Sequence, residues 1–360
     1  SGHMDTVPLG EEPWTRDPFG GETADGKQYG LGIFDMKGGM SAAMLAARCL
    51  RELGAELRGD LLIECVADEE FGGANGTLAA RLRGYEADAA IIPEPTNMAV
   101  CPVNQGGVYY RAVFESEPGR SYDRVAFESA SGRPLDGERP TNPVAAAARF
   151  VDVVRRYGEW RAERGRPALF AGQSLPTIIQ GIHAGDARFD LGDREPSSCY
   201  VDVWLQIWPG TTEEAIYREF TDFVRPLAER DDVLSAMPPR FERKMRFLPG
   251  TGIAADHPIV GALTRAGQQA SPNGLPLKGA PFACDSFVFN LHSRTPAVIC
   301  GPAGGNAHGA DEYILVEEFM TLVEIYALAI ADWCGIAGQQ LESAASGAFR
   351  REERPDSRPE

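Results

Sequence analysis

The sequence lacks the features that mark several large classes of protein. Its 360 residues contain 35 Lys and Arg against 52 Asp and Glu, a formal net charge of −17, so a basic face for nucleic-acid phosphates is missing. No apolar run approaches roughly 18 residues, and no basic start leads into an apolar segment, so neither a membrane span nor a signal peptide is visible. We therefore expect no nucleic-acid partner, no membrane partner and a cytoplasmic location.

Cysteine pairs and several catalytic motifs are also missing. The seven cysteines are scattered, odd in number and never spaced as Cys-x-x-Cys, which argues against a disulfide framework and fits a reducing compartment. The segment YGLG lacks the third glycine of the dinucleotide fingerprint, GPAGGNAHG has no Gly-Lys-Ser/Thr, and no Gly-x-Ser-x-Gly occurs. These absences disfavour nucleotide binding and serine hydrolase chemistry.

The chain does have an ordinary globular composition, with 43% hydrophobic and 24% charged residues, and a length that favours two domains. A helical pattern at residues 40–53 and continuous apolar runs at residues 60–68 and 87–95 predict an α/β domain with a largely parallel sheet. We assign residues 1–106 and 247–336 to this domain. Residues 337–360, rich in Ser, Arg, Glu and Pro, are expected to form a disordered tail.

The segment 107–246 shows a different order of elements. Strand composition at residues 108–114 is followed by a helical pattern at 142–161, strands at 175–182 and 198–208, a helix at 212–229 and a strand at 240–248. The order strand, helix, strand, strand, helix, strand is that of a ferredoxin-like α+β layer. We therefore predict an inserted second domain.

Carboxylates and histidines collect just beyond the strands predicted for the first domain. The carboxyl ends of the strands of an open α/β sheet converge on one crevice, so residues far apart in the sequence can meet there. Each of these residues alone has an ordinary structural explanation, but five such segments together point to a shared metal site. The candidates are His3, Asp5, Asp35, Glu69, Glu70, Glu94 and His308.

The number of candidate ligands matches two zinc ions. Two ions that share one carboxylate need about four further nitrogen or oxygen ligands. Asp35 supplies the bridge, and the four further ligands are His3, Glu70, Glu94 and His308.

Two acidic candidates then have no ligand role. Asp5 follows His3 by two residues, on the same side of an extended segment, where it can orient the imidazole. Glu69 is adjacent to the proposed ligand Glu70, which suits a general base that acts on water at the metal.

Five segments make the sequence resemble a known enzyme family. GHMDTVP, YGLGIFDMKGG, ADEEFGG, PEPT and NAHGADEY resemble, in order and spacing, the motifs of the di-zinc aminoacylase and exopeptidase family, which includes acetylornithine deacetylase, succinyl-diaminopimelate desuccinylase and glutamate carboxypeptidases. The resemblance runs from Ser1 to about Gly335. It implies a zinc-exopeptidase-like α/β domain with a mixed, largely parallel sheet, an inserted ferredoxin-like lid, and a cis peptide bond after Asp35.

The resemblance also implies an activity. It assigns the bridging position to Asp35, the general base to Glu69 and the orientation of His3 to Asp5. The implied reaction is hydrolysis of the amide bond of an N-acyl amino acid or related small substrate by a deacylase, with water activated by two zinc ions, for which cobalt or manganese can substitute. A dipeptidase or carboxypeptidase of the same family is the alternative, as is a non-catalytic metal-binding relative. The loop GGNAHGADEY favours the deacylase, and the intact Glu69 argues against the non-catalytic relative.

The chain departs from the family pattern in its lid. The family places a histidine there that reaches across a dimer interface, but this sequence has no histidine between residues 3 and 183, and Ala130 or Ser131 is the nearest match. Gln206 replaces the lid arginine, and Asn142 is a candidate substrate contact. A homodimer through the lid is still implied by the resemblance. Because one oxyanion donor is missing, we expect either low activity or a different donor.

Family members have several tens of residues before the first motif, whereas Ser1 stands at that motif here. We therefore expect an N-terminally incomplete catalytic domain with an exposed apolar strip where the further elements would pack.

Overall fold

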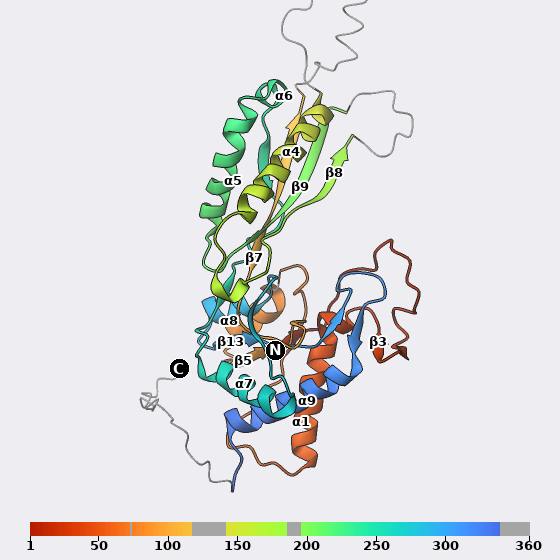
Figure 1. The fold of residues 1–360 in the computed structure, drawn as a ribbon, viewed down its shortest axis with the longest axis vertical. Coiled ribbons are helices and arrows are strands. Elements are labelled where there is room, and N and C mark those ends of the chain that lie inside the picture. Colours follow the sequence, from red (N-terminus) through yellow and green to blue (C-terminus); the bar gives the residue numbers. More distant parts are fainter. Residues whose placement is uncertain (73, 117–141, 186–195, 339–360) are drawn as a thin grey trace, which may run out of the picture.

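The computed structural model describes residues 1–72, 74–116, 142–185 and 196–338, and it has two parts (Figure 1). One part contains a mixed sheet and the helices α1 (Gly38–Glu52), α7 (Pro258–Ala270) and α9 (Val316–Cys334). The other contains a four-stranded sheet and the helices α4 (Pro143–Ala162) and α5 (Glu213–Ala228). The expected tail falls almost wholly outside the described residues. Within those residues, no helix is both long enough and apolar enough to cross a membrane.

The sheet of the first part mixes parallel and antiparallel pairs. Strand β5 is parallel to β13 and β12 is parallel to β6, whereas β13 and β11 are antiparallel to β6. The bounds are β5 (Ala90–Ile92), β6 (Val100–Asn104), β11 (Thr251–Gly252), β12 (Leu277–Ala280) and β13 (Ala297–Ile299). The α/β class and the mixed sheet expected from the sequence are confirmed.

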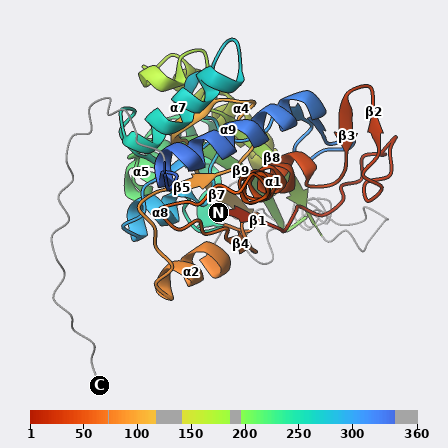
Figure 2. The ribbon, with the colours of Figure 1, turned by 90° about the horizontal axis from the view of Figure 1, so that it is seen from below.

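Helices cover both faces of this sheet because its strands alternate. In β13, Val298 packs toward α1, α7 and α9, whereas Ala297 and Ile299 pack toward the face where α8 lies. The helices are α1 (Gly38–Glu52), α7 (Pro258–Ala270), α8 (Ser286–His292) and α9 (Val316–Cys334). Figure 2 shows α1, α7 and α9 together on one side, and the helix predicted at residues 40–53 is confirmed.

The strand predicted at residues 60–68 is wrong in its extent. Only β4 (Cys65–Val66) pairs, in parallel with β1 (Gly2–His3). Residues 60–64 form no strand, because among the described residues no neighbouring strand offers them a ladder of hydrogen bonds. Leu61, Leu62 and Ile63 are 40, 53 and 39% exposed, so an apolar strip is exposed here.

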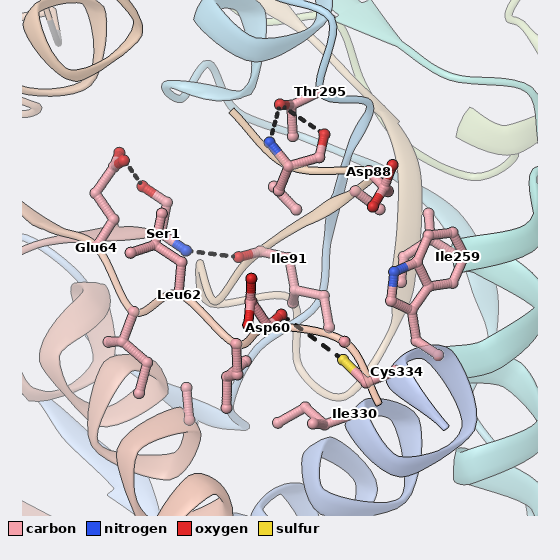
Figure 3. A pocket seen from close by; sticks show the side chains of 18 of the residues that line it. Ser1, Asp60, Leu62, Glu64, Asp88, Ile91, Ile259, Thr295, Ile330 and Cys334 are labelled. Atoms are coloured by element: carbon pink, nitrogen blue, oxygen red, sulfur yellow. Dashed lines mark hydrogen bonds between the residues drawn. The ribbon is translucent and has the colours of Figure 1, made fainter. Parts of the chain in front are cut away.

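A cavity of about 400 Å³ lies beside this strip, between residues 59–64, β5 and the helix α9 (Figure 3). Leu62, Ile91 and Ile330 contribute apolar side chains to its wall, and the amino group of Ser1 donates a hydrogen bond to the Ile91 carbonyl at its edge. None of the candidate metal ligands lines it.

A second, small antiparallel sheet brings the start and the end of the first part together. Its order is β14-β15-β3-β2. The bounds are β2 (Thr23–Ala24), β3 (Lys27–Tyr29), β14 (Gly304–Gly305) and β15 (Tyr313–Leu315). Two π-helical turns complete this part, Ile33–Lys37 before α1 and Ala74–Leu78 before α2 (Ala79–Leu82).

The second part has the predicted ferredoxin-like order. All its strands are antiparallel, in the spatial order β10-β7-β9-β8, with α4 and α5 on one face. The bounds are β7 (Gly106–Glu115), α4 (Pro143–Ala162), η3 (Ala168–Phe170), β8 (Thr177–Ala184), β9 (Ser198–Ile207), α5 (Glu213–Ala228), α6 (Asp232–Ala236) and β10 (Arg240–Arg243).

A separate aromatic core holds this second part together. Phe150 of α4 is fully buried, and its ring lies 5.6 Å from that of Phe114 in β7 and 6.4 Å from that of Phe220 in α5. Both helices start at side-chain caps: Asn142 accepts hydrogen bonds from the first turn of α4, and Thr212 accepts one from Ala215 in α5. The second part is therefore a hydrophobic unit of its own.

Candidate metal centre

The seven residues predicted from the sequence converge at one place in the first part. His3 ends β1, Glu69 and Glu70 follow β4, and Glu94 follows β5. Asp35 lies in the π-helical turn before α1, and the peptide bond that follows it is cis, as expected. His308 lies in the loop between β14 and β15, so the small sheet carries it to the other ligands.

Asp35 stands between the two histidines. Its Oδ1 lies 3.1 Å from Nε2 of His3, and its Oδ2 lies 3.2 Å from Nε2 of His308. His3 is 1% exposed, whereas the side chain of His308 is 51% exposed, so one side of the centre is closed and the other is open. A carboxylate that contacts two imidazoles through different oxygens is arranged like a bridging ligand.

The remaining carboxylates divide between the two histidines. Oε1 of Glu94 and Oε2 of Glu69 each lie 3.8 Å from Nε2 of His3. Oε2 of Glu70 lies 3.1 Å from Nε2 of His308. Each side of Asp35 therefore has one imidazole and at least one carboxylate.

Asp5 contacts both His3 and the loop that carries the glutamates. Nδ1 of His3 lies 3.0 Å from the backbone carbonyl of Asp5 and 3.6 Å from its carboxylate, so the carbonyl is the nearer partner of the ring. The Asp5 carboxylate accepts hydrogen bonds from the backbone N–H groups of Glu69 and Glu70. Asp5 thus connects the first strand to the position of the candidate base.

The electrostatics of the cluster favour cations. Burial works to lower the pKa of His3, but the hydrogen bond to Asp35 and the nearby charge of Glu69 outweigh it and raise the pKa to about 9. Hydrogen bonds to Asp35 and Glu70 raise the pKa of His308 to about 10. Burial works to raise the pKa of Asp35, but the two histidines hold it below its usual range. Two positive charges are therefore stabilised where the ligand atoms meet.

The candidate base has a raised proton affinity. Burial, and after it the charge of Asp285, raise the pKa of Glu69 well above the usual value for a carboxyl group. Burial and the charge of Asp35 do the same for Glu94.

The donor set fits a pair of zinc ions. Imidazole nitrogens and carboxylate oxygens are ordinary zinc ligands, and His3, Asp35 and Glu70 offer ligand atoms within 4.8 Å of one another. Oε1 of Glu70 is buried without a hydrogen-bond partner among the described residues, which is costly for a carboxylate unless a cation balances it. His3, Glu69 and Glu94 form a second group within the same limit, so distance alone does not separate the candidate base from the ligands.

Glu312 is a site residue that the sequence analysis did not identify. It is 2% exposed, and its carboxylate accepts hydrogen bonds from the backbone N–H groups of Gly32, Phe34 and Asp35 at 2.6 to 2.9 Å. It therefore fixes the turn that presents Asp35. The only sequence signal was its place in NAHGADEY, four residues after His308.

Asp285 was also missed. It is 4% exposed, its Oδ2 accepts a hydrogen bond from the Thr77 hydroxyl, and burial raises its pKa to about 6. It follows β12 and precedes α8, so it has the same position beyond a strand as the candidates that were found. The strand β12 was not predicted, and its site residue was lost with it.

The remaining candidates lie elsewhere. Asn142 uses its side-chain oxygen as the N-cap of α4. Ala130 and Ser131 fall outside the described residues.

Comparison with known proteins identifies the family of the chain. The model of peptidase family M20/M25/M40 matches residues 1–332, so the chain belongs to that family. N-formyl-4-amino-5-aminomethyl-2-methylpyrimidine deformylase of Bacillus subtilis (strain 168) is 28% identical, over 94% of this chain and 80% of the relative.

Solved structures show the same fold. The M20 family metallo-carboxypeptidase Sso-CP2 from Sulfolobus solfataricus superposes with a TM-score of 0.63 at 15% identity, over 91% of this chain and 83% of that chain. Human carnosine dipeptidase 1 gives a TM-score of 0.62 at 16% identity, over 92% and 79%. The resemblance stated from the five motifs is confirmed, and the chain is an amide-bond hydrolase by family.

Proposed function

We propose that this chain is a deacylase that hydrolyses the amide bond of an N-acyl amino acid or a related small N-acyl substrate, with two zinc ions and Glu69 as general base. The observation that carries the proposal is the position of Asp35, whose oxygens lie 3.1 and 3.2 Å from the imidazoles of His3 and His308. A carboxylate between two imidazoles suits two cations that share one ligand.

Five side chains would hold the two ions. His3 and Glu94 lie on one side of Asp35, and Glu70 and His308 lie on the other. Zinc bound here supplies Lewis acidity, which polarises an amide carbonyl and lowers the pKa of water. Cobalt or manganese should replace zinc at such nitrogen and oxygen ligands.

Glu69 supports a proton transfer by this chain itself. Its carboxylate lies at the cluster, 3.8 Å from Nε2 of His3, and its raised pKa suits a group that takes a proton from water and passes it to the leaving nitrogen. Asp5 fixes the backbone at Glu69, so the base has a defined position. No serine or cysteine acts as the nucleophile, and we expect no covalent intermediate.

The choice of a deacylase rests on the similarity to a deformylase over most of the chain. That enzyme acts on an N-formyl group, which is a small acyl group on an amine. The solved relatives are under 25% identical and support the fold, not the substrate. A dipeptidase or carboxypeptidase remains the second candidate, because the same centre cleaves a peptide bond by the same chemistry.

We also propose that the chain forms a homodimer through the lid, residues 107–246, and acts on small molecules. The edge strand β8 supports this assembly, because Ile178 and Ile182 are 42 and 52% exposed on it.

A substrate panel tests the proposal. Zinc-loaded protein is incubated with N-formyl and N-acetyl amino acids, an N-formyl aminopyrimidine and a set of dipeptides, and the release of amine is measured. We expect release from the N-acyl substrates, and loss of that release in protein stripped of metal by a chelator. Cleavage of dipeptides alone would show that the chain is a peptidase and not a deacylase. No release from any member would contradict the proposal.

A further inference from the structure

Asp285 is a buried carboxyl group that has no ligand role in the proposed centre. It lies between β12 and α8 and is 4% exposed. Its neighbour Cys284 packs in the same apolar cluster as Met36, the residue that follows Asp35. Asp285 is therefore fixed in the core of the catalytic part, close to the turn that carries a candidate metal ligand.

The segment that carries the candidate base has little regular structure. Glu69 follows β4, and the next regular element is the π-helical turn Ala74–Leu78. Within the segment, the N–H group of Gly72 donates a hydrogen bond to the Glu69 carbonyl. The carboxylate of Asp68 accepts hydrogen bonds from the backbone and the side chain of Asn75 at 3.3 and 2.8 Å. These contacts close the segment on itself but do not attach it to the rest of the molecule.

Asp5 and Asp285 attach this segment to other elements, one at each end. At its start, the Asp5 carboxylate accepts hydrogen bonds from the N–H groups of Glu69 and Glu70 at 3.4 and 3.3 Å, which are long for such bonds. At its end, the hydroxyl of the fully buried Thr77 donates a hydrogen bond to Oδ2 of Asp285. The contact to Asp285 therefore ties the far end of the segment to α8, 208 residues away in the sequence.

The carboxylate of Asp285 depends on Thr77 for its pairing. Its Oδ1 is buried and has no hydrogen-bond partner in the described part of the chain, so loss of the Thr77 hydroxyl would leave the buried group unpaired at both oxygens. After burial, the charge of Asp285 contributes most to the raised pKa of Glu69, ahead of the opposing effect of His3. Nε2 of His3 lies 3.8 Å from Oε2 of Glu69, and electrostatic effects fall with distance, so Asp285 is also close to the base.

We propose that Asp285 is a positioning residue, which holds the candidate base Glu69 in place through its hydrogen bond to Thr77. The inference rests on the proposed function, because it takes Glu69 as the general base. Proton transfer needs the donor and acceptor atoms about 2.6 to 3.2 Å apart, and a displacement of about 1 Å can lower a rate about 100-fold. With Asp5 at the start of the segment and Asp285 at its end, the backbone of the base keeps its place beside the metal ligands. Asp285 itself takes up no proton in this role.

Hydrogen exchange tests this attachment without requiring turnover. The zinc-loaded full chain is exchanged in deuterated water, and the peptide that spans residues 67–78 is followed by mass spectrometry. Thr77→Val keeps the shape of the side chain and removes the hydroxyl, so we expect the amides of residues 69–72 to exchange about tenfold faster. Asp285→Ala should have the same effect. The two substitutions together should add little to either one, because both remove the same hydrogen bond.

Kinetic constants separate positioning of the base from a general structural effect. With a substrate that the panel shows to be cleaved, kcat of Thr77→Val should fall about 10- to 100-fold, while KM and zinc content stay within about twofold of the wild type. Thr77→Ser, which keeps the hydroxyl, should recover most of the loss. Thr264→Val is the matched control, because Thr264 in α7 is half-buried and donates a 2.8 Å hydrogen bond to the Val260 carbonyl. It should change neither the exchange of residues 69–72 nor kcat.

Three results would overturn the inference. Unchanged exchange of residues 69–72 in Thr77→Val would do so whatever the activity, and so would faster exchange with an unchanged kcat. A fall in zinc content in proportion to kcat would show that Thr77 acts on the metal ligands and not on the base. Faster exchange in a chain that releases amine from no member of the panel would contradict only the proposed function.

Discussion

The lid and the catalytic part use β-structure in opposite ways. Strands β7 and β9 pair over ten residues, and the helices α4 and α5 bury an aromatic core on one face of that sheet. In the catalytic part β1 and β4 have two residues each and β5 has three, and the candidate ligands His3, Glu70 and Glu94 lie at the end of such a strand or just beyond it. Asp35 lies in the turn before α1, and His308 lies in the loop between β14 and β15. Long ladders stabilise the lid, whereas short strands bring many chain segments to one point. Substitutions in the two regions should therefore separate stability from chemistry.

The strongest test on the catalytic side is Glu69→Gln. The change keeps the size and removes the proton acceptor, so we expect turnover to fall by about 10² to 10⁴ while two zinc equivalents remain bound. Amine release and elemental analysis measure the two quantities. Glu86→Gln, which changes an exposed glutamate after α2, is the control and should keep full activity. A loss of less than about tenfold would mean that another group transfers the proton.

The corresponding substitution in the lid is Phe150→Ala. It removes a fully buried ring that contacts Phe114 and Phe220, so the free energy of unfolding should fall by about 3 to 5 kcal/mol. Urea unfolding measures this loss. Val144→Ala on the same helix, where the side chain is 40% exposed, should cost much less. The folded variant should keep its zinc content, and a fall in zinc content would show that the two regions are not independent.

The raised pKa values of the histidines predict that zinc binding releases protons. In the metal-free protein the pKa of His3 is raised to about 9 and that of His308 to about 10, so both imidazoles carry protons at pH 8 and must lose them to bind zinc. The apparent affinity for each ion should therefore rise by up to about tenfold from pH 7 to pH 8, or about 100-fold for the product of the two binding constants, and level off above about pH 10. Calorimetry in buffers of different ionisation enthalpy counts these protons. Binding without proton release at pH 8 would contradict the electrostatic account of the cluster.

Glu312→Gln should have a smaller effect on metal binding than the loss of a ligand. The amide nitrogen cannot accept the backbone N–H groups that the carboxylate now accepts, so the turn that presents Asp35 loses support. Substitution of residues that orient metal ligands typically costs about 10- to 100-fold in affinity. Competition with a chromophoric chelator measures the change. Glu317→Gln in the first turn of α9 is the control. Equal zinc affinities in the two variants would show that Glu312 does not support the metal ligands.

The comparison also explains which features could be predicted from the sequence. In the lid, long elements carry enough residues for their periodicity to be clear, and the helix predicted at 142–161 is found at Pro143–Ala162. In the catalytic part, the apolar run at 60–68 has strand composition but pairs only at Cys65–Val66, because pairing depends on neighbours that composition does not reveal.

The residues of the site also fall into those that the sequence could predict and those that it could not. His3, Asp35 and His308 could be predicted because their residue types are metal ligands and their segments carry recognisable motifs. Glu312 acts through backbone hydrogen bonds to a turn 277 residues or more away in the sequence, and Asp285 accepts a hydrogen bond from Thr77, 208 residues before it. Neither contact has a local pattern in the sequence, so only the fold reveals them.

The central claim is that Asp35 joins two metal positions, one at His3 and one at His308. The most direct measurement is the zinc content of the wild type and of His308→Ala after identical loading and removal of free metal, with Tm as a check of folding. The account predicts two equivalents in the wild type and about one in His308→Ala, with the position at His3 and Glu94 retained. Two equivalents in the folded variant, or one in the wild type, would contradict it.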